Sequence, residues 1–449
     1  MPYNPTADSF ASRNTNTGDT TTGCSQIPLT AARRIPWSAS TPIAADSPVR
    51  WPKYLKYLLF SVAPCVAAFS TPAVAQVTHL PSVPQPSAAH DVVGFNFQNP
   101  GGVALPAQLV TFGEVFATGT VQKTDSLQAT LSTGEVVPVQ MDAKSTYPDG
   151  SVKFAVVTVK QPGLAAGQVI GGMLQTGGPT PGTAVNLDAL ATKLRQVVKV
   201  VVYSSAVPAT FSPAAAAQVG TASTVYDLAI GPALHKSLTG GSPDCWLQGP
   251  LVTQCRVDIP VAGSLHAVFD ISSYNMSRNH IVEDMQLRND YAMTPNGGVM
   301  TYDVSTNFNG QKIHYSQITE YQYQAWHQVL WSSGPPVVNV QHDILALEKT
   351  GAIPSYSVKD GVDASLIAGN AGFAQPALLM SPGVLNNDGI TMYMGQTGGR
   401  CDVSFVSCVD AEWLMTQDPQ AAANALGWAD AAGAIAWHYW SPAHGRYIN

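Results

Sequence analysis

The chain has 449 residues, of which 45% are hydrophobic and 11% are charged, and its net charge is −7 at pH 7. This length allows two or three domains and a large core. The charged fraction is well below the roughly 25% of an average globular protein, so the surface consists mainly of uncharged polar residues. An acidic chain gives no support to nucleic-acid binding, which normally requires a basic surface. Such a surface suits neutral sugars, although it also suits other exported β-proteins.

Residues 49–75 have the three parts of a secretory signal peptide. A basic stretch ends at Lys56, an apolar stretch covers 57–69, and Ala73 and Ala75 form a small-residue cleavage site. The apolar stretch is too short for a transmembrane helix. We therefore expect a secreted or periplasmic protein with no membrane span after signal cleavage.

Residues 1–48 precede this signal and are rich in Ser, Thr, Ala and Pro, without a periodic pattern. This composition is typical of disordered segments. Because signal peptides normally begin at the initiator residue, we also expect that translation could start at Val49 through a GTG codon. Residues 1–48 are thus predicted to be either a disordered leader or the product of a misplaced start.

Four cysteines follow the predicted signal peptide, namely Cys245, Cys255, Cys401 and Cys408. An even number of cysteines in an exported protein favours disulfides. Three pairings are possible, and the simplest joins Cys245 to Cys255 and Cys401 to Cys408. A four-cysteine zinc site is the alternative, but neither spacing is the short one typical of zinc ligands. We expect no metal and no cofactor.

The first half of the mature chain is predicted to be β-rich. Residues 76–105 are rich in Pro, Ser and Gly and are expected to be a linker. Residues 106–205 contain runs of Val, Thr and Phe separated by Gly-containing breaks, which predicts a domain of consecutive strands. Within it, Asp149 and Gly150 are expected to form a turn rather than to take part in chemistry.

Residues 206–350 are predicted to form a β-sandwich of long antiparallel strands. The pair Asn309-Gly310 between two strand-like runs indicates a hairpin with a type I′ turn. Between residues 321 and 331 the pattern repeats every second residue, which is typical of a half-buried strand. His327 falls on the apolar side of this pattern and is expected to be a core residue.

The last part of the chain is different. Residues 351–408 are predicted to be an irregular connection, and residues 409–449 to begin a helical domain. Asp418 is expected to cap a helix that starts at Pro419. This helix is apolar nearly all round and must be covered on several sides. Either a partner chain covers it, or the chain is the front part of a longer protein.

Two stretches resemble one family of proteins. Residues 110–159, with the "TFG" opening and the "DGSV" turn, resemble the N-terminal barrel of rhamnogalacturonan exolyase-like proteins, which are secreted polysaccharide lyases. Residues 393–440 are similar to the segment of related bacterial proteins in which the β-part gives way to an α/α toroid. The similarity extends in order over much of residues 108–445. The toroid of the family continues well beyond Asn449, so the resemblance implies a C-terminally truncated chain.

The predicted fold is therefore mostly β. A β-barrel and an antiparallel β-sandwich are expected, followed by a short helical segment that resembles the start of an α/α toroid. The resemblance implies that the toroid contributes to a sugar cleft.

A lyase that acts on an acidic polysaccharide must neutralise the uronate carboxylate, remove the C5 proton and protonate the leaving oxygen. In the segment "WHYW", His438 is a candidate base, Tyr439 a candidate acid and Trp440 a candidate stacking platform for a sugar. The alternative is that these residues cap the helix and fill the core.

Arg400 follows two glycines and suits a carboxylate ligand. The alternative is a salt bridge to Asp402 or Asp410. Tyr393, at the start of the same segment, and Trp326 are further candidates for substrate binding, although core packing is the commoner position of a strand tryptophan.

The sequence contains no GxSxG, HExxH, Walker or dinucleotide-binding motif. We expect an exported carbohydrate-active protein that binds a polysaccharide or oligosaccharide and cleaves an acidic glycan by β-elimination. The alternatives are a non-catalytic glycan-binding or cell-envelope structural protein, or an inactive fragment of a longer lyase.

Overall fold

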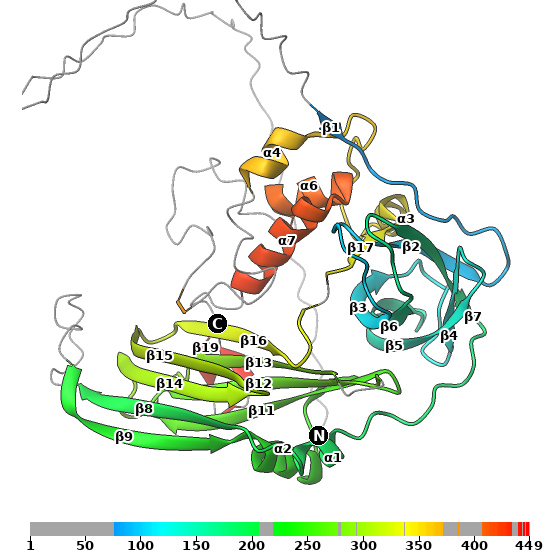
Figure 1. Cartoon of the computed structure of the whole chain (residues 1–449). Coiled ribbons are helices and arrows are strands. Elements are labelled where there is room, and N and C mark those ends of the chain that lie inside the picture. Colours follow the sequence, from blue (N-terminus) through cyan, green and yellow to red (C-terminus); the bar gives the residue numbers. More distant parts are fainter. Residues whose placement is uncertain are drawn as a thin grey trace, which may run out of the picture. The chain divides into compact units, whose positions relative to one another are not determined.

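The computed structural model describes residues 76–205, 219–276, 280–292, 294–335, 337–370, 384–385, 406–432, 439–441, 443–444 and 446–448. The chain divides into two units, Met1–Ser70 and Thr71–Asn449, and every described residue belongs to the second unit. This unit is mostly β and carries a few short helices near its C-terminus, which confirms the predicted fold class (Figure 1).

Seven antiparallel strands form a barrel-like sheet in the order β17-β2-β7-β4-β5-β6-β3. The two edge strands approach each other, because His342 Nδ1 on β17 lies 3.4 Å from the carboxylate of Glu114 on β3. The sheet is therefore nearly closed. Its strands are β2 (Asp91–Gln98), β3 (Gln108–Val115), β4 (Leu127–Leu131), β5 (Val136–Thr146), β6 (Val152–Gln161), β7 (Val169–Thr176) and β17 (Asn339–His342).

The barrel is filled by large apolar side chains, among which Phe95, Phe97 and Phe116 are fully buried. Gly172 on β7 lies directly against one of these rings, and a Cβ at this position would lie 2.3 Å from Phe95. A larger residue would displace the ring from a close-packed core. The sequence thus places a glycine where the barrel core leaves no room for a side chain.

The predicted turn at Asp149-Gly150 is confirmed. Gly150 has a φ of 87°, a conformation that glycine adopts readily. The Asp149 carboxylate accepts a hydrogen bond of 3.0 Å from the Ser151 backbone N–H. Asp149 therefore stabilises the turn between β5 and β6.

A second group of strands forms two sheets that share one core. The five-stranded sheet has the order β10-β11-β12-β13-β16, and the four-stranded sheet has the order β15-β14-β8-β9. The strands of the first sheet are β10 (Cys245–Gln248), β11 (Val252–Ala262), β12 (Leu265–Tyr274), β13 (His280–Arg288) and β16 (Ala325–Trp331). Those of the second are β8 (Val197–Ser205), β9 (Val219–Ala229), β14 (Met300–Phe308) and β15 (Gln311–Glu320).

The core between the two sheets contains apolar side chains from both. Phe269 and Trp326 come from the five-stranded sheet, and Tyr302 and Val304 come from the four-stranded sheet. Two short helices, α1 (Leu187–Ala191) and α2 (Ile230–Thr239), add further apolar side chains to it. These sheets correspond to the predicted sandwich.

The predicted hairpin is confirmed. Asn309 and Gly310 connect β14 to β15, and their φ angles of 49° and 88° are those of a type I′ turn.

The prediction for residues 321–331 was wrong in its phase. The strand β16 begins only at Ala325, because residues 321–324 form a turn in which the Tyr321 N–H binds the side chain of Gln324. Trp326 faces the shared core, whereas His327 lies on the opposite face of the sheet. The tyrosines before the strand fit the same two-residue pattern although they lie in a turn. Counting them as strand residues led to the prediction that His327 faces the core.

The sheets also divide the chain at points that differ from the predicted domain limits. The expected linker, 76–105, contains β2, which lies inside the barrel-like sheet. Strand β8, within the predicted first domain, pairs with β9 and β14 of the second group. Strand β17, within the predicted sandwich, pairs with β2.

The helix predicted to start at Pro419 is confirmed at its N-terminal end, and another helix precedes it. Helix α6 (Cys408–Thr416) has a capping box formed by Ser407 and Asp410. Helix α7 (Pro419–Ala432) begins at the proline, and Asp418 accepts a 2.8 Å hydrogen bond from the Gln420 N–H. The other elements are β1 (Val77–Thr78), α3 (Ile344–Thr350), β18 (Val362–Asp363), α4 (Ala364–Gly369), β19 (Tyr439–Ser441) and β20 (Arg446–Ile448).

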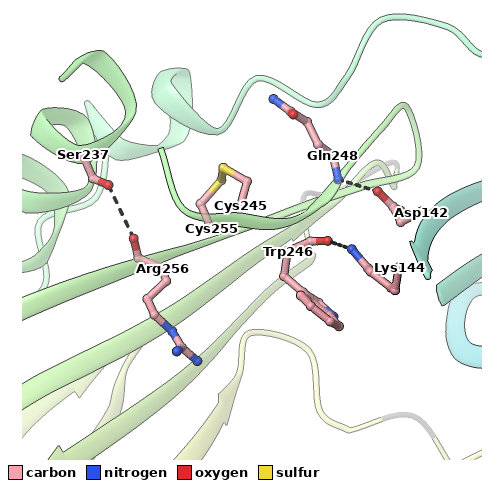
Figure 2. The surroundings of a disulfide bond; sticks show 8 residues. All are labelled: Asp142, Lys144, Ser237, Cys245, Trp246, Gln248, Cys255 and Arg256. Atoms are coloured by element: carbon pink, nitrogen blue, oxygen red, sulfur yellow. Dashed lines mark hydrogen bonds between the residues drawn. A yellow bond between two sulfur atoms is a disulfide. The ribbon is translucent and has the colours of Figure 1, made fainter. Parts of the chain in front are cut away.

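The predicted disulfide between Cys245 and Cys255 is confirmed and joins β10 to β11 (Figure 2). Cys408 is also disulfide-bonded. Its predicted partner, Cys401, lies outside the described residues, so this pairing stays a prediction.

Beside the first disulfide, strand β5 of the barrel contacts β10. The Gln248 N–H donates a hydrogen bond of 2.8 Å to Asp142, and the ammonium group of Lys144 lies 4.1 Å from the ring centre of Trp246 (Figure 2). Lys144 also donates to the Trp246 carbonyl. The disulfide therefore holds β10, the strand that makes these contacts with β5, against β11.

Candidate functional site

The five-stranded sheet has one apolar face and one charged face. Arg256, Asp270 and Asp284 occupy directly opposite positions on β11, β12 and β13. Gln286 and His327 are opposite each other on β13 and β16. Because side chains alternate along a strand, these residues all point away from the shared core. We call this surface the polar face.

A cavity of about 360 Å³ lies on the polar face, within the range of small-molecule sites. Four strands of the sheet and helix α7 contribute to its wall. The residues that line it are Arg256, Asp270, Asp284, Gln286, Arg288, Ala325, Trp326, His327, Ala429 and Asp430.

An ion pair between Arg256 and Asp270 forms one side of the cavity. The guanidinium group donates two hydrogen bonds, of 2.8 and 2.7 Å, to the two carboxylate oxygens. Gln286 joins this pair to Asp284, since its Nε2 lies 3.0 Å from an oxygen of each aspartate. The Arg256 side chain remains 41% exposed, so a ligand in the cavity can reach it.

His327 lies between two carboxylates. Its Nδ1 is 2.9 Å from Asp284, and its Nε2 is 3.5 Å from Asp430 on α7. Burial alone would lower its pKa, but the hydrogen bond and charge of Asp284, together with the charge of Asp430, raise the pKa of His327 to about 9. The side chain is therefore an imidazolium cation at neutral pH.

Behind the cavity, the network continues into the protein. Arg288 donates hydrogen bonds of 3.0 and 2.5 Å to Asp290. His266 lies between Asp290, at 2.6 Å, and Asp258, at 2.7 Å, and its ring stacks on Tyr291. These partners fix the position of Arg288 at the cavity wall.

The charge states of this inner part follow from its contacts. Burial opposes ionisation of both members of the His266–Asp290 pair, but each member's charge favours that of the other. Arg288 also lowers the pKa of Asp290, and Asp258 together with Asp290 raises the pKa of His266. The contacts therefore favour the charged form of each group.

The structure brings part of the predicted site close to this network. The Trp440 N–H on β19 donates to the carbonyl of Asp290 at 3.0 Å, and the Ala292 N–H donates to the carbonyl of Trp440 at 2.7 Å. The backbone of Tyr439 and Trp440 thus lies beside the end of β13, two residues from Arg288. The Tyr439 side chain, and the whole of His438, Arg400 and Tyr393, lie outside the described residues.

The structure does not support a stacking role for Trp326. Although this residue borders the cavity, it is only 1% exposed, and its indole N–H donates a 2.7 Å hydrogen bond to the Tyr302 hydroxyl in the shared core. A ring with both faces covered cannot stack on a sugar. The correction follows from the phase of β16 described above.

Apart from Trp326, sequence reasoning did not propose the residues that line the cavity as site residues. Their signal was the alternation of charged and apolar residues in segments such as "CRVDI" on β11 and "EDMQLR" on β13. This alternation places the charges on one face, but it does not show that three strands align them. Asp430 lies on a helix that the sequence describes only as apolar nearly all round.

Among the described residues, no group of three or more His, Cys, Asp and Glu side chains is arranged to hold a metal ion. Within the same residues, no helix has the length and apolar character needed to cross a membrane.

The fold and the cavity describe a mostly β protein with a barrel, a two-sheet region and a charged site. Residues 102–169, from just before β3 to the first residue of β7, match the PcRGLX-like N-terminal RIFT barrel domain. Residues 102–169 are therefore similar to a barrel domain of a rhamnogalacturonan lyase-like family. The matched domain agrees with the resemblance in residues 110–159. A search of curated proteins finds no match to the chain.

Proposed function

We propose that this protein is an exported carbohydrate-active protein that cleaves an acidic polysaccharide by β-elimination. The observation that carries the proposal is the match of residues 102–169 to the barrel domain of a rhamnogalacturonan lyase-like family. The cavity on the polar face supports it through Arg256, whose partly exposed guanidinium suits a carboxylate, although Asp270, Asp284 and Asp430 also line the wall.

In this proposal the cavity performs the first of the three tasks of a lyase, which is to neutralise the uronate carboxylate. Arg256 and the imidazolium of His327 offset the negative charge of the uronate carboxylate, which acidifies the proton on C5. A base then removes this proton, its electron pair forms the C4–C5 double bond, and the C4–O4 bond breaks as O4 receives a proton. His327 is already protonated at neutral pH and cannot be that base.

We retain His438 as the base and Tyr439 as the acid. Their support is the course of β19, whose backbone follows residues 290–292 directly after the cavity residue Arg288. Arg400 and Tyr393 remain proposed substrate contacts, as does Trp440.

Ultraviolet absorbance tests the reaction, since each cleavage creates a conjugated C4–C5 double bond. The chain is incubated with a panel of acidic glycans that includes rhamnogalacturonan and polygalacturonate. We expect His327→Gln to lower kcat/KM by about 100-fold, as loss of a charge-stabilising donor does. The matched control is His314→Gln, because His314 is exposed on β15 and does not line the cavity.

One observation favours a second function, namely non-catalytic binding of an acidic glycan. Every ionised residue of the cavity described above has a partner of opposite charge, as expected for a rigid binding surface. No absorbance rise on any glycan, together with binding that His327→Gln weakens, would support this second function and contradict cleavage.

Export is part of the proposal. The disulfide between Cys245 and Cys255 supports it, because disulfides persist mainly in oxidising compartments. N-terminal sequencing of the protein from the culture medium or periplasm should begin at Gln76. A peptide from residues 1–48 in that product would contradict the predicted start at Val49.

A further inference from the structure

A second cavity, of about 860 Å³, lies away from the polar face. It is formed where the connection from α1 to β8, the turn between β14 and β15, and the end of β16 come together. The residues that line it are Lys193, Leu194, Arg195, Gln196, Val197, Ile281, Asn307, Phe308, Asn309, Gly310, Ser332 and Ser333. We call it the hairpin cavity.

The charge of the hairpin cavity is opposite to that of the whole chain. Its wall contains two cations, Lys193 and Arg195, and no carboxylate, although the chain has a net charge of −7. Both cations are exposed, and the guanidinium of Arg195 is held by a 2.9 Å hydrogen bond to the Thr192 carbonyl. A hollow lined by charges of one sign concentrates ligands of the other sign.

A buried amide contributes to the wall of the hairpin cavity. Gln196 is only 6% exposed, and its Nε2 donates hydrogen bonds to Glu283 at 2.8 Å and to Thr306 at 3.3 Å. Its Oε1 has no hydrogen-bond partner in the described part of the chain. This oxygen is closed to solvent, so Gln196 shapes the wall through its contacts to Glu283 and Thr306 and offers the ligand no further acceptor.

The remaining polar groups suit a polyhydroxylated ligand. Asn307, Asn309, Ser332 and Ser333 supply both donors and acceptors, as sugar recognition requires. Asn309 is positioned by the hydrogen bond of 3.1 Å from its Nδ2 to the Ser332 carbonyl, which links the hairpin turn to the end of β16. The apolar side chains of Leu194 and Phe308 complete the wall.

We propose that the hairpin cavity is a second glycan-binding site, which takes an oligosaccharide that carries a carboxylate. Lys193 and Arg195 bind the carboxylate, and the amides and serines bind the ring hydroxyls. The site holds the glycan without cleaving it. That the anion is an acidic glycan rests on the proposed function, whereas the preference for an anion rests on the cavity alone.

Calorimetric titration with trigalacturonate tests this site in the full chain. All proteins carry His327→Gln, so that cleavage and binding at the polar face contribute little. We expect the double substitution Lys193→Gln and Arg195→Gln to weaken binding about tenfold, as the loss of charged hydrogen bonds does. The matched control is Lys123→Gln, which removes an exposed cation that lines neither cavity.

Affinity that is unchanged by the double substitution, or equally reduced by Lys123→Gln, would overturn the second site and leave the proposed function intact. If the His327→Gln parent binds no trigalacturonate, the hairpin cavity does not take an acidic glycan, whereas the proposed function is still decided by the absorbance assay on the chain that retains His327. Titration with inorganic sulfate then tests whether the hairpin cavity binds an anion, independently of any glycan. Sulfate binding that depends on Lys193 and Arg195 supports it, and the absence of such binding overturns it.

Discussion

The two faces of the five-stranded sheet are built from the same strands and yet have opposite chemistry. On the inner face, Phe269, Met285 and Trp326 pack into the core shared with the four-stranded sheet. On the polar face, one residue further along the same strands, Asp270, Gln286 and His327 form a charged network. The comparison shows that one sheet can stabilise the fold with alternate residues and present a ligand site with the others.

Two buried acids, Glu320 on β15 and Asp290 just after β13, differ in the direction of their pKa shifts. Glu320 is fully buried in the core, where burial raises its pKa well above the ordinary range despite hydrogen bonds from Tyr302 and the Asn289 N–H. Asp290, behind the polar face, is equally inaccessible but has cationic partners, and its pKa is lowered. Partners rather than burial therefore decide the charge of these two acids.

The largest effect is expected for the inner face. Trp326→Ala should lower the free energy of unfolding by about 4 kcal/mol, because it removes a fully buried ring and leaves a cavity. The control is Trp331→Ala, which removes a partly exposed ring from the same strand. Denaturant unfolding measures both. An equal loss for the two variants would contradict the orientation of β16.

The next effect tests the polar network. Asp290→Ala removes the carboxylate that the buried side chains of Arg288 and His266 share, and it should cost about 3 kcal/mol of unfolding free energy. Asp227→Ala is the control, since its ion pair with Lys199 is exposed and should contribute less than about 1 kcal/mol. If the two losses are similar, the network contributes no more than a surface pair.

His327 should make stability depend on pH. Its folded-state pKa of about 9 lies above the ordinary 6.5, so its ion pairs stabilise the fold fully below pH 6.5 and are lost as the pH rises to 9. Compared with His327→Gln, the parent should lose roughly 2 to 3 kcal/mol across this window. Unfolding experiments at several pH values measure it. A constant difference between the two proteins would contradict the raised pKa.

The smallest effect concerns Glu283, which is buried on the inner face beside Gln196. Burial raises its pKa from 4.5 to about 7, so its ionisation destabilises the fold as the pH rises from 4.5 through 7. Glu283→Gln should therefore stabilise the protein by about 2 kcal/mol at pH 8 and have little effect at pH 4. A gain that is independent of pH would show that packing, rather than ionisation, is responsible.

The parts of the fold that depend on local sequence were predictable. The turns at Gly150 and Gly310, the start of α7 at Pro419 and the disulfide between Cys245 and Cys255 all follow from neighbouring residues. Strand phase failed where Tyr321 and Tyr323, which lie in a turn, imitated the pattern of β16. The local pattern does not show where a strand begins.

The cavity on the polar face was not predictable, because it depends on register. Arg256, Asp270 and Asp284 are adjacent only because three strands align them, and Asp430 reaches His327 from a helix more than 100 residues later in the sequence. No spacing in one sequence encodes such an alignment. The sequence predicts that the charged residues of each strand share one face of the sheet, but it does not predict that they form one site.

The position of β17 has a consequence for folding during synthesis. This strand, at residues 339–342, pairs with β2 at residues 91–98, although the strands of both sandwich sheets lie between them in the sequence. The barrel-like sheet therefore cannot complete its seventh strand until the ribosome has made the sandwich strands. Until then, the edge of β2 is exposed and open to pairing with other chains. A gene fragment that ends before residue 339 would retain this edge permanently and should aggregate on expression.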